Sequence, residues 1–171
     1  MSTKSRTAIL FVCLGNICRS PLAEGVFRAI VAERGLEHAF EIDSAALGDW
    51  HVGGPPDARS VAVANRVGID ISLQRARQIA LPDFSRFDLI FGMDRSNISR
   101  LCELAPKEAR QRIHLFLDYA LGKEEDVPDP YYGTEENFSE VYEKIREASE
   151  ALISRLAPES PPRRGQASSI T

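Results

Sequence analysis

Residues 8–21 read AILFVCLGNICRSP and join an apolar run, a short loop and the start of a helix. The run at 8–12 contains no polar residue, which is typical of a strand buried on both faces of a parallel sheet. Ser20 is a suitable N-cap and Pro21 suits a first helical turn, after which apolar residues recur at helical spacing up to Arg34. The stretch therefore predicts a strand, a tight loop and a helix in direct succession.

The rest of the chain repeats this alternation. Further strands are predicted at 40–44, 88–93 and 113–117, and further helices at 57–67, 96–104 and 138–156, the second of them capped by Asp94 or Ser96. The order predicts a doubly wound α/β domain, with a mostly parallel four-stranded sheet and helices on both faces. We expect this domain to cover residues 1–157 and the Pro/Ser-rich residues 158–171 to form a disordered tail.

Composition indicates a globular protein and disfavours membrane and nucleic-acid partners. The chain has 171 residues, of which 43% are hydrophobic and 27% charged, and its longest apolar run, at 8–14, is too short to cross a bilayer. A net charge of −4 argues against a non-specific binder of nucleic acid. Lys4 and Arg6 before that run resemble the start of a signal peptide, but polar residues follow at once without a cleavage pattern. We therefore expect a cytoplasmic protein. A separate expectation is that the protein is a monomer.

The three cysteines, Cys13, Cys18 and Cys102, are too few and odd in number for a disulfide framework. Zinc bound at Cys13 and Cys18 would need further cysteine or histidine ligands at matching spacing, and the three histidines are scattered singly. We expect no metal site and no cofactor.

The loop after the first strand suits the binding of a phosphoryl group. The helix that follows directs unpaired N–H groups and its positive dipole end at the loop. Gly15 permits unusual backbone angles and Asn16 tolerates a left-handed one, so the loop can curl its N–H groups into an anion-binding nest. The planar guanidinium of Arg19 matches two phosphate oxygens.

Cys13 ends the first strand, at the sheet edge where ligands bind in doubly wound domains. The donors that bind phosphate also favour a thiolate, which is a nucleophile for in-line displacement at phosphorus. The Ser20 hydroxyl can donate to this sulfur. A cysteine taken alone is more often a small buried hydrophobe. Because Gly15, Asn16, Arg19 and Ser20 all stand where a phosphate cradle requires them, we interpret Cys13 as a nucleophile.

Residues 12–21 resemble the signature loop of the low-molecular-weight protein tyrosine phosphatases, and Asp129-Pro130-Tyr131 resembles the acid motif of that family. The resemblance covers roughly residues 8–157 and implies hydrolysis of phosphotyrosine in proteins through a cysteinyl-phosphate. It assigns Cys13 as nucleophile, Arg19 as phosphate ligand and Asp129 as the acid that later becomes the base. The other loop residues that it places around the phosphoryl group are Leu14, Gly15, Asn16, Ile17, Cys18 and Ser20.

The resemblance also implies a slot with aromatic walls, formed by Tyr131 and Tyr132 on one side and Trp50 on the other. Such a slot admits phosphotyrosine and excludes the shorter phosphoserine. The alternatives are that Trp50 packs in the core and that Asp129 is only a turn residue, with Asp126 a second carboxylate nearby. Ile17 stands where the related protein arginine phosphatases have threonine, which favours phosphotyrosine.

Two positions qualify the resemblance. Leu73 is interpreted as standing where relatives have a histidine that supports the loop asparagine, which would leave Asn16, Ser20 and Ser44 to hold the loop alone. The resemblance also implies that Cys18 captures an oxidised Cys13 as a reversible disulfide, and a plain packing role is the alternative. Cys102 is expected in the core.

Three other functions are alternatives to that of a tyrosine phosphatase. A thioredoxin-coupled arsenate reductase of the same fold needs two further resolving cysteines, but only Cys102 is available. A protein arginine phosphatase is disfavoured by Ile17. A non-catalytic phosphate-binding module is disfavoured because both Cys13 and Asp129 are present.

Overall fold

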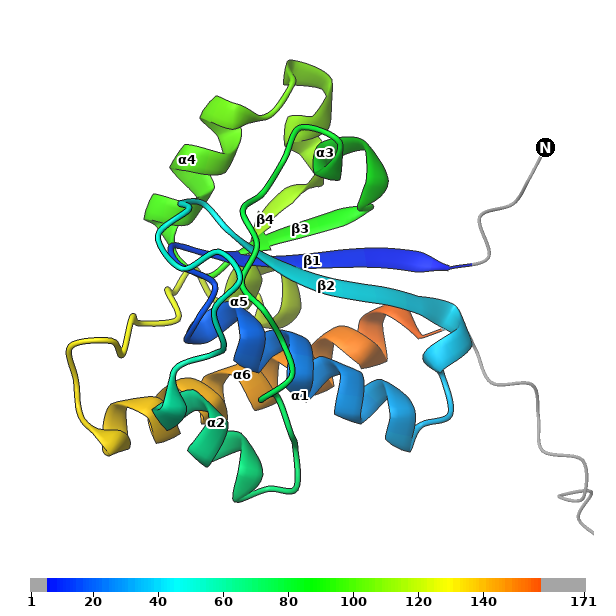
Figure 1. The fold of residues 1–171 in the computed structure, drawn as a ribbon. Coiled ribbons are helices and arrows are strands. Elements are labelled where there is room, and N and C mark those ends of the chain that lie inside the picture. The colour runs from blue at the N-terminus through cyan, green and yellow to red at the C-terminus, as the bar shows by residue number, and fades with distance from the viewer. Residues whose placement is uncertain (1–5, 158–171) are drawn as a thin grey trace, which may run out of the picture.

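The computed structural model describes residues 6–157 and contains one four-stranded sheet flanked by helices (Figure 1). The strands are β1 (Thr7–Cys13), β2 (Phe40–Ala46), β3 (Leu89–Gly92) and β4 (Ile113–Leu115). Their order is β2-β1-β3-β4, and all three pairings are parallel. The predicted fold class is confirmed. The predicted tail at 158–171 lies outside the described residues.

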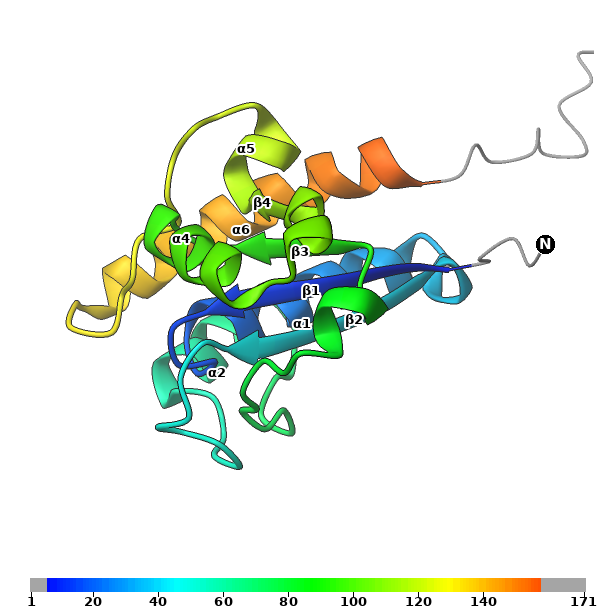
Figure 2. The same cartoon turned by 90° about the horizontal axis from the view of Figure 1, so that it is seen from above.

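Side chains of β1 point alternately into two apolar cores, one on each face of the sheet. Ile9 and Phe11 pack in the larger core, whereas Leu10 and Val12 pack in the smaller one. The larger core lies under α1 (Arg19–Glu33), α2 (Ala58–Asn65), α5 (Phe116–Leu121) and α6 (Glu135–Leu156). The smaller lies under α3 (Asp83–Arg86), α4 (Arg95–Leu104) and the 3-10 helix η2 (Lys107–Arg112), as Figures 1 and 2 show. A strand buried on both faces explains why residues 8–12 are uniformly apolar.

Some predicted boundaries are wrong. The strand predicted at 113–117 ends at Leu115, and Phe116 and Leu117 begin α5. Both of these side chains are almost wholly buried, and a short apolar run does not distinguish a buried strand from a buried helix. The sequence patterns also missed α3, η2 and the 3-10 helix η1 (Glu37–Ala39), which are too short to show a helical period.

The start of α1 also differs from the prediction. Cys18 is the N-cap and makes no side-chain capping bond, so Ser20 lies within the first turn instead of capping it. Its hydroxyl is therefore available to the loop before the helix.

The sheet has its topological switch point at β1. The chain passes from β1 to β2 on one side and then to β3 on the other, so the carboxyl end of β1 faces a crevice between diverging connections. Cys13 is the last residue of β1 and is paired in register with Ala46 of β2. This topology brings together the segments that follow β1, β2 and β3.

Candidate active site

The loop from Cys13 to the start of α1 turns its peptide N–H groups inward. The carbonyls of Cys13, Leu14 and Ile17 accept bonds from Leu47, Gly48 and Asp57 on the outside of the loop. In a trans peptide the next N–H points the opposite way from the carbonyl, so these N–H groups face the space above Cys13. Asn16 has φ 56°, the left-handed conformation expected of it, whereas Gly15 has an ordinary φ. A Cβ at residue 15 would lie 3.1 Å from Cδ2 of His51, so close packing is the reason for this glycine.

A chain of hydrogen bonds orients the hydroxyl beside the Cys13 sulfur. Ser20 Oγ lies 3.0 Å from Cys13 Sγ and accepts a bond from Asn16 Nδ2 at 2.8 Å. Because this oxygen already accepts from an amide, its own proton is free to point at the sulfur. Asn16 Nδ2 also donates to Ser44 Oγ, which in turn donates to the buried carboxylate of Glu24. Burial is the main cause that raises the pKa of Glu24 above its ordinary value.

Arg19 is buried, and hydrogen bonds hold its guanidinium in a fixed orientation. Its Nη1 binds Asp94 Oδ2 at 2.6 Å and the carbonyl of Val127 at 3.0 Å. Its Nη2 lies 3.6 Å from Asp129 Oδ2. Asp94 is also the N-cap of α4, where its other carboxylate oxygen accepts from the N–H of Asn97. The guanidinium is thus fixed between two segments that follow β3 and β4 in the chain.

Asp129 lies at the rim of the same cavity. Its carboxylate accepts a bond from the N–H of Tyr131, and its side chain is 42% exposed. Asp126 instead accepts from the N–H of Arg95 at the start of α4 and does not line the cavity. The structure therefore places Asp129, and not its neighbour, beside Arg19.

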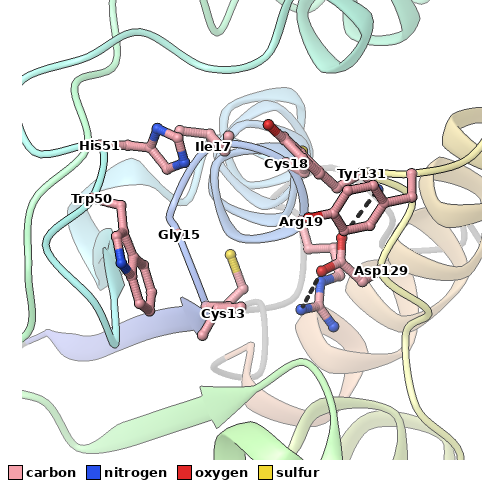
Figure 3. A pocket seen from close by; sticks show the side chains of 11 residues that line it. Cys13, Gly15, Ile17, Cys18, Arg19, Trp50, His51, Asp129 and Tyr131 are labelled. Atoms are coloured by element: carbon pink, nitrogen blue, oxygen red, sulfur yellow. Dashed lines mark hydrogen bonds and ion pairs between the residues drawn. The ribbon is translucent and has the colours of Figure 1, made fainter.

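The cavity has a volume of about 240 Å³ and is open to solvent above Cys13. Figure 3 shows Trp50 and Tyr131 on opposite sides of it, with Cys13 between them. Its lining consists of Cys13, Leu14, Gly15, Ile17, Cys18, Arg19, Trp50, His51, Asp129, Tyr131 and Tyr132. Asn16 and Ser20, also predicted for the site, are buried and do not line the cavity. Trp50 is 67% exposed, so it belongs to the cavity wall and not to the core.

The segment that carries Asp129 has no regular secondary structure and is held by Arg59 of α2. Arg59 donates to the carbonyls of Tyr131 and Gly133, and its guanidinium forms an ion pair with Asp57. It also stacks on the ring of Phe138, 4.4 Å from the ring centroid. These contacts connect the segment that carries Asp129 to α2 and α6.

Comparison with known proteins identifies the family. The family model described as low molecular weight phosphotyrosine protein phosphatase matches residues 8–161. This chain belongs to that family. The phosphatase of this family from Schizosaccharomyces pombe is 43% identical over 87% of this chain and 96% of its own. The low molecular weight protein-tyrosine-phosphatase YfkJ of Bacillus subtilis is 42% identical over 89% and 97% of the two chains.

Solved structures agree with this assignment to the low molecular weight phosphatases. The crystal structure of YfkJ superposes with a TM-score of 0.83, at 41% identity over 90% of this chain and 96% of that one. The tyrosine phosphatase of Entamoeba histolytica, crystallised with Hepes in its active site, superposes with a TM-score of 0.83 at 36% identity, over 88% and 96% of the chains. The family prediction is confirmed.

The expectation that Asn16, Ser20 and Ser44 alone hold the loop of this phosphatase is wrong. Leu73 is 83% exposed, and its side chain has no hydrogen-bonding group that could support Asn16. Asn16 is supported from this segment by a backbone group instead, because its Oδ1 accepts from the N–H of Arg77 at 3.1 Å. Next to Leu73, the part-buried Gln74 donates to the carbonyl of Pro21 in α1. Asn16, Ser20 and Ser44 therefore do not hold the loop alone.

The cysteines of this phosphatase are all free. Cys18 lines the cavity, and burial, with smaller contributions from nearby Asp57 and Cys13, raises the pKa of its thiol to about 12. Cys18 is therefore a neutral thiol at neutral pH. Cys102 packs against the smaller core, as predicted. This core lies on the opposite face of the sheet from the larger core.

Three residues at or behind the site were not predicted as part of it: His51, Arg59 and Asp94. Asp94 was expected only as a helix cap, which is a local signal, whereas its bond to Arg19 spans 75 positions in the sequence. Within residues 6–157, no three His, Cys, Asp or Glu side chains are grouped as a metal site. Over the same residues no helix has both the length and the apolar character needed to span a membrane.

Proposed function

We propose that this protein hydrolyses phosphotyrosine in protein substrates, with Cys13 as the nucleophile. The observation that carries the proposal is the juxtaposition of the Cys13 sulfur, hydrogen-bonded to Ser20, with Arg19 and Asp129 around one cavity. Relatives across the whole domain are named phosphotyrosine phosphatases, which supports the same reaction. The alternative functions of arsenate reductase and arginine phosphatase have no comparable support in this site.

In the first step the Cys13 thiolate attacks phosphorus in line with the ester oxygen. An S–P bond forms and the P–O bond to tyrosine breaks, while Asp129 gives its proton to the departing phenolate. Arg19 and the inward N–H groups of the loop bind the three equatorial oxygens, where charge is spread in the transition state. Positioning of Arg19 by Asp94 is therefore part of the catalytic apparatus.

In the second step water attacks the phosphorus of the cysteinyl-phosphate. Asp129, now a carboxylate, takes a proton from this water, and the S–P bond breaks to release phosphate. The Ser20 hydroxyl, 3.0 Å from the sulfur, stabilises the departing thiolate. The enzyme returns to its starting state without a metal or an organic cofactor.

The walls of the cavity account for the choice of substrate. A phenyl ring whose phosphate reaches Arg19 lies between Trp50 and Tyr131, which face each other across Cys13 (Figure 3). Aromatic side chains favour stacked or edge contacts with such a ring. A phosphoserine is too short to reach the buried nucleophile from this rim. Ile17, which also lines the cavity, supplies apolar surface to the ring.

Further expectations belong to the same proposal. We infer that Cys18, beside Cys13 in the cavity, captures an oxidised nucleophile as a reversible disulfide. We also infer that the protein acts as a monomer in the cytoplasm and that residues 1–157 form its catalytic domain.

Replacement of the nucleophile tests the proposal. Cys13→Ser is expected to abolish hydrolysis of p-nitrophenyl phosphate while retaining phosphate binding, because the cradle of N–H groups and Arg19 is unchanged. The wild type should work in the presence of EDTA and be inhibited by vanadate. Substantial turnover by Cys13→Ser would contradict the mechanism.

Substrate class is tested separately. Peptides of one sequence carrying phosphotyrosine, phosphoarginine or phosphoserine should be hydrolysed with kcat/KM highest for phosphotyrosine. Equal or faster hydrolysis of phosphoarginine would replace the tyrosine assignment while leaving the role of Cys13 intact.

A further inference from the structure

A second hollow adjoins the catalytic cavity. It has a volume of about 410 Å³ and shares two lining side chains, Leu14 and Trp50, with the cavity above Cys13. Both side chains are well exposed, Leu14 by 47% and Trp50 by 67%. Figure 3 shows Trp50 on the side of the loop away from Tyr131, and the same side chain also lines the second hollow. A Cβ at Gly48 would lie 2.0 Å from Cζ3 of Trp50, so the indole position depends on this glycine.

The far wall of this hollow is polar and carries one charge. Ser96 and Arg100 are four residues apart on α4 and therefore lie on one face of the helix, toward the hollow. Gln78 also lines it and uses its amide to bind the carbonyl of Leu47. Of the described residues that line the hollow, Arg100 alone is charged. The hollow thus has an apolar border toward the catalytic cavity and a cation at its other side.

Arg100 can exchange its present ion-pair partner for another carboxylate. Arg100 forms an ion pair with Glu103 at 2.9 Å, and both side chains are more than half exposed, by 56% and 66%. Such exposed pairs contribute little to stability because water screens them. A carboxylate from a ligand can therefore replace Glu103 at small cost.

We propose that this hollow is a subsite for an acidic side chain within two residues of the phosphotyrosine in a protein substrate, with Arg100 as its partner. The inference rests on the proposed function of the adjoining cavity. A peptide whose phosphotyrosine enters that cavity must continue over its rim, and an extended chain advances about 3.3–3.6 Å per residue. On the side of Leu14 and Trp50, the next side chains therefore arrive at the hollow. A glutamate there can lay its methylenes on the apolar border and reach Arg100 with its carboxylate.

The test compares peptides with a single phosphotyrosine and with Glu, Leu or Lys placed singly at the two positions on either side of it. We expect the wild type to prefer Glu over Lys, in kcat/KM, by roughly three- to tenfold at one or more of these positions. Arg100→Glu should remove or invert that preference. Glu103→Gln should enlarge it, because Arg100 then has no competing partner. Hydrolysis of p-nitrophenyl phosphate, which has no flanking residues, provides the reference rate for each variant.

Lys107→Glu is the matched control, since it changes the net charge by the same amount and lies outside the hollow. It should leave the Glu-to-Lys ratio unchanged. The proposal is overturned if Arg100→Glu and the wild type show the same Glu-to-Lys ratio of kcat/KM at every position. It is also overturned if Leu is preferred over Glu and this preference is the same in Arg100→Glu. Either result leaves the proposed function standing as long as the wild type hydrolyses phosphotyrosine and Cys13→Ser does not.

Discussion

At the scale of single residues, Asp94 performs two tasks with one carboxylate. One oxygen caps α4 through Asn97, and the other holds Nη1 of Arg19 at 2.6 Å. Asn97 completes a capping box by accepting from the N–H of Asp94. The strong constraint on the guanidinium therefore originates in a helix terminus on the opposite face of the sheet from α1.

The two tasks can be separated by substitution. Asp94→Asn retains a good N-cap but loses the charge facing Arg19, whereas Asp94→Ala loses both. We expect kcat/KM for p-nitrophenyl phosphate to fall roughly ten- to a hundredfold in both variants, because Arg19 is no longer held in place. Urea unfolding should show Asp94→Ala less stable than Asp94→Asn by about 1 kcal/mol, which is the usual worth of a cap. Equal activity of Asp94→Asn and the wild type would show that Arg19 needs no charged partner there.

Replacement of Asp129 tests its proposed role as general acid. Asp129→Asn should slow the first release of phenol from phenyl phosphate by about 10² to 10⁴, since no acid remains to protonate the phenolate. The effect should be much smaller for an aryl phosphate whose phenol is strongly acidic. Rapid-quench measurement of the first turnover separates this step from the later hydrolysis, in which Asp129 acts as base. The matched variant Asp126→Asn should behave as the wild type, because Asp126 does not line the cavity.

At the scale of elements, the acid-bearing segment depends on α2. Residues 122–134 contain no helix or strand, yet Arg59 binds two carbonyls just beyond Asp129 and stacks on Phe138 of α6. Asp57, its ion-pair partner, caps α2 and accepts from the N–H of Arg59. Hydrogen bonding to Arg59 lowers the pKa of Asp57 below its ordinary value. This arrangement ties the position of the acid to the start of α2.

Arg59→Lys tests that link. Lysine keeps the positive charge but lacks the planar fork that reaches several acceptors at once, so the acid segment should lose its fixed position. We expect the first release of phenol from phenyl phosphate to slow by roughly ten- to a hundredfold. In the Asp129→Asn background the same substitution should have little further effect, because the two residues act in one pathway. Additive losses in the double variant would instead indicate a general effect on the fold.

For the molecule as a whole, a titratable group that packs against the larger core makes stability depend on pH. His114 of β4 lies against the rings of Phe91 and Tyr119. Burial, aided by Arg155, lowers the pKa of His114 below its ordinary value of 6.5. A histidine that resists protonation in the folded state makes stability depend on pH.

The sign of that dependence follows from linkage. Between the lowered pKa and 6.5 the unfolded chain binds more protons at His114 than the folded protein does, so the free energy of unfolding falls as pH falls. The contribution is fully present above 6.5 and is lost as pH drops through the folded value. The free energy of unfolding, measured with urea at a series of pH values, should depend less steeply on pH in this window for His114→Gln than for the wild type. His38→Gln, at an exposed position, is the control and should keep the wild-type slope.

The local sequence alone predicts the chemistry proposed for the loop that begins at Cys13. Cys13, Asn16, Arg19 and Ser20 are within eight positions of one another, so their contacts are set by one strand, one turn and one helix. Alternation of apolar strands and amphipathic helices likewise determined the doubly wound class, because burial on two faces requires that pattern. Short elements such as α3, and the boundary between β4 and α5, could not be predicted from the sequence, because a few apolar residues fit a buried helix and a buried strand equally.

The contacts that hold the loop and Asp129 in place join segments far apart in the sequence, so they are visible in the folded structure alone. Asn16 meets the N–H of Arg77 across 61 positions, Arg19 meets Asp94 across 75, and Arg59 meets Tyr131 across 72. The physical reason is that parallel strands end at one edge of the sheet, which gathers segments that are distant in the chain. A backbone N–H such as that of Arg77 leaves no mark in the choice of side chain, so this support of Asn16 could not be predicted from the sequence. The same convergence brings Arg100 of α4 beside Leu14 and Trp50, and so provides the subsite next to the catalytic cavity.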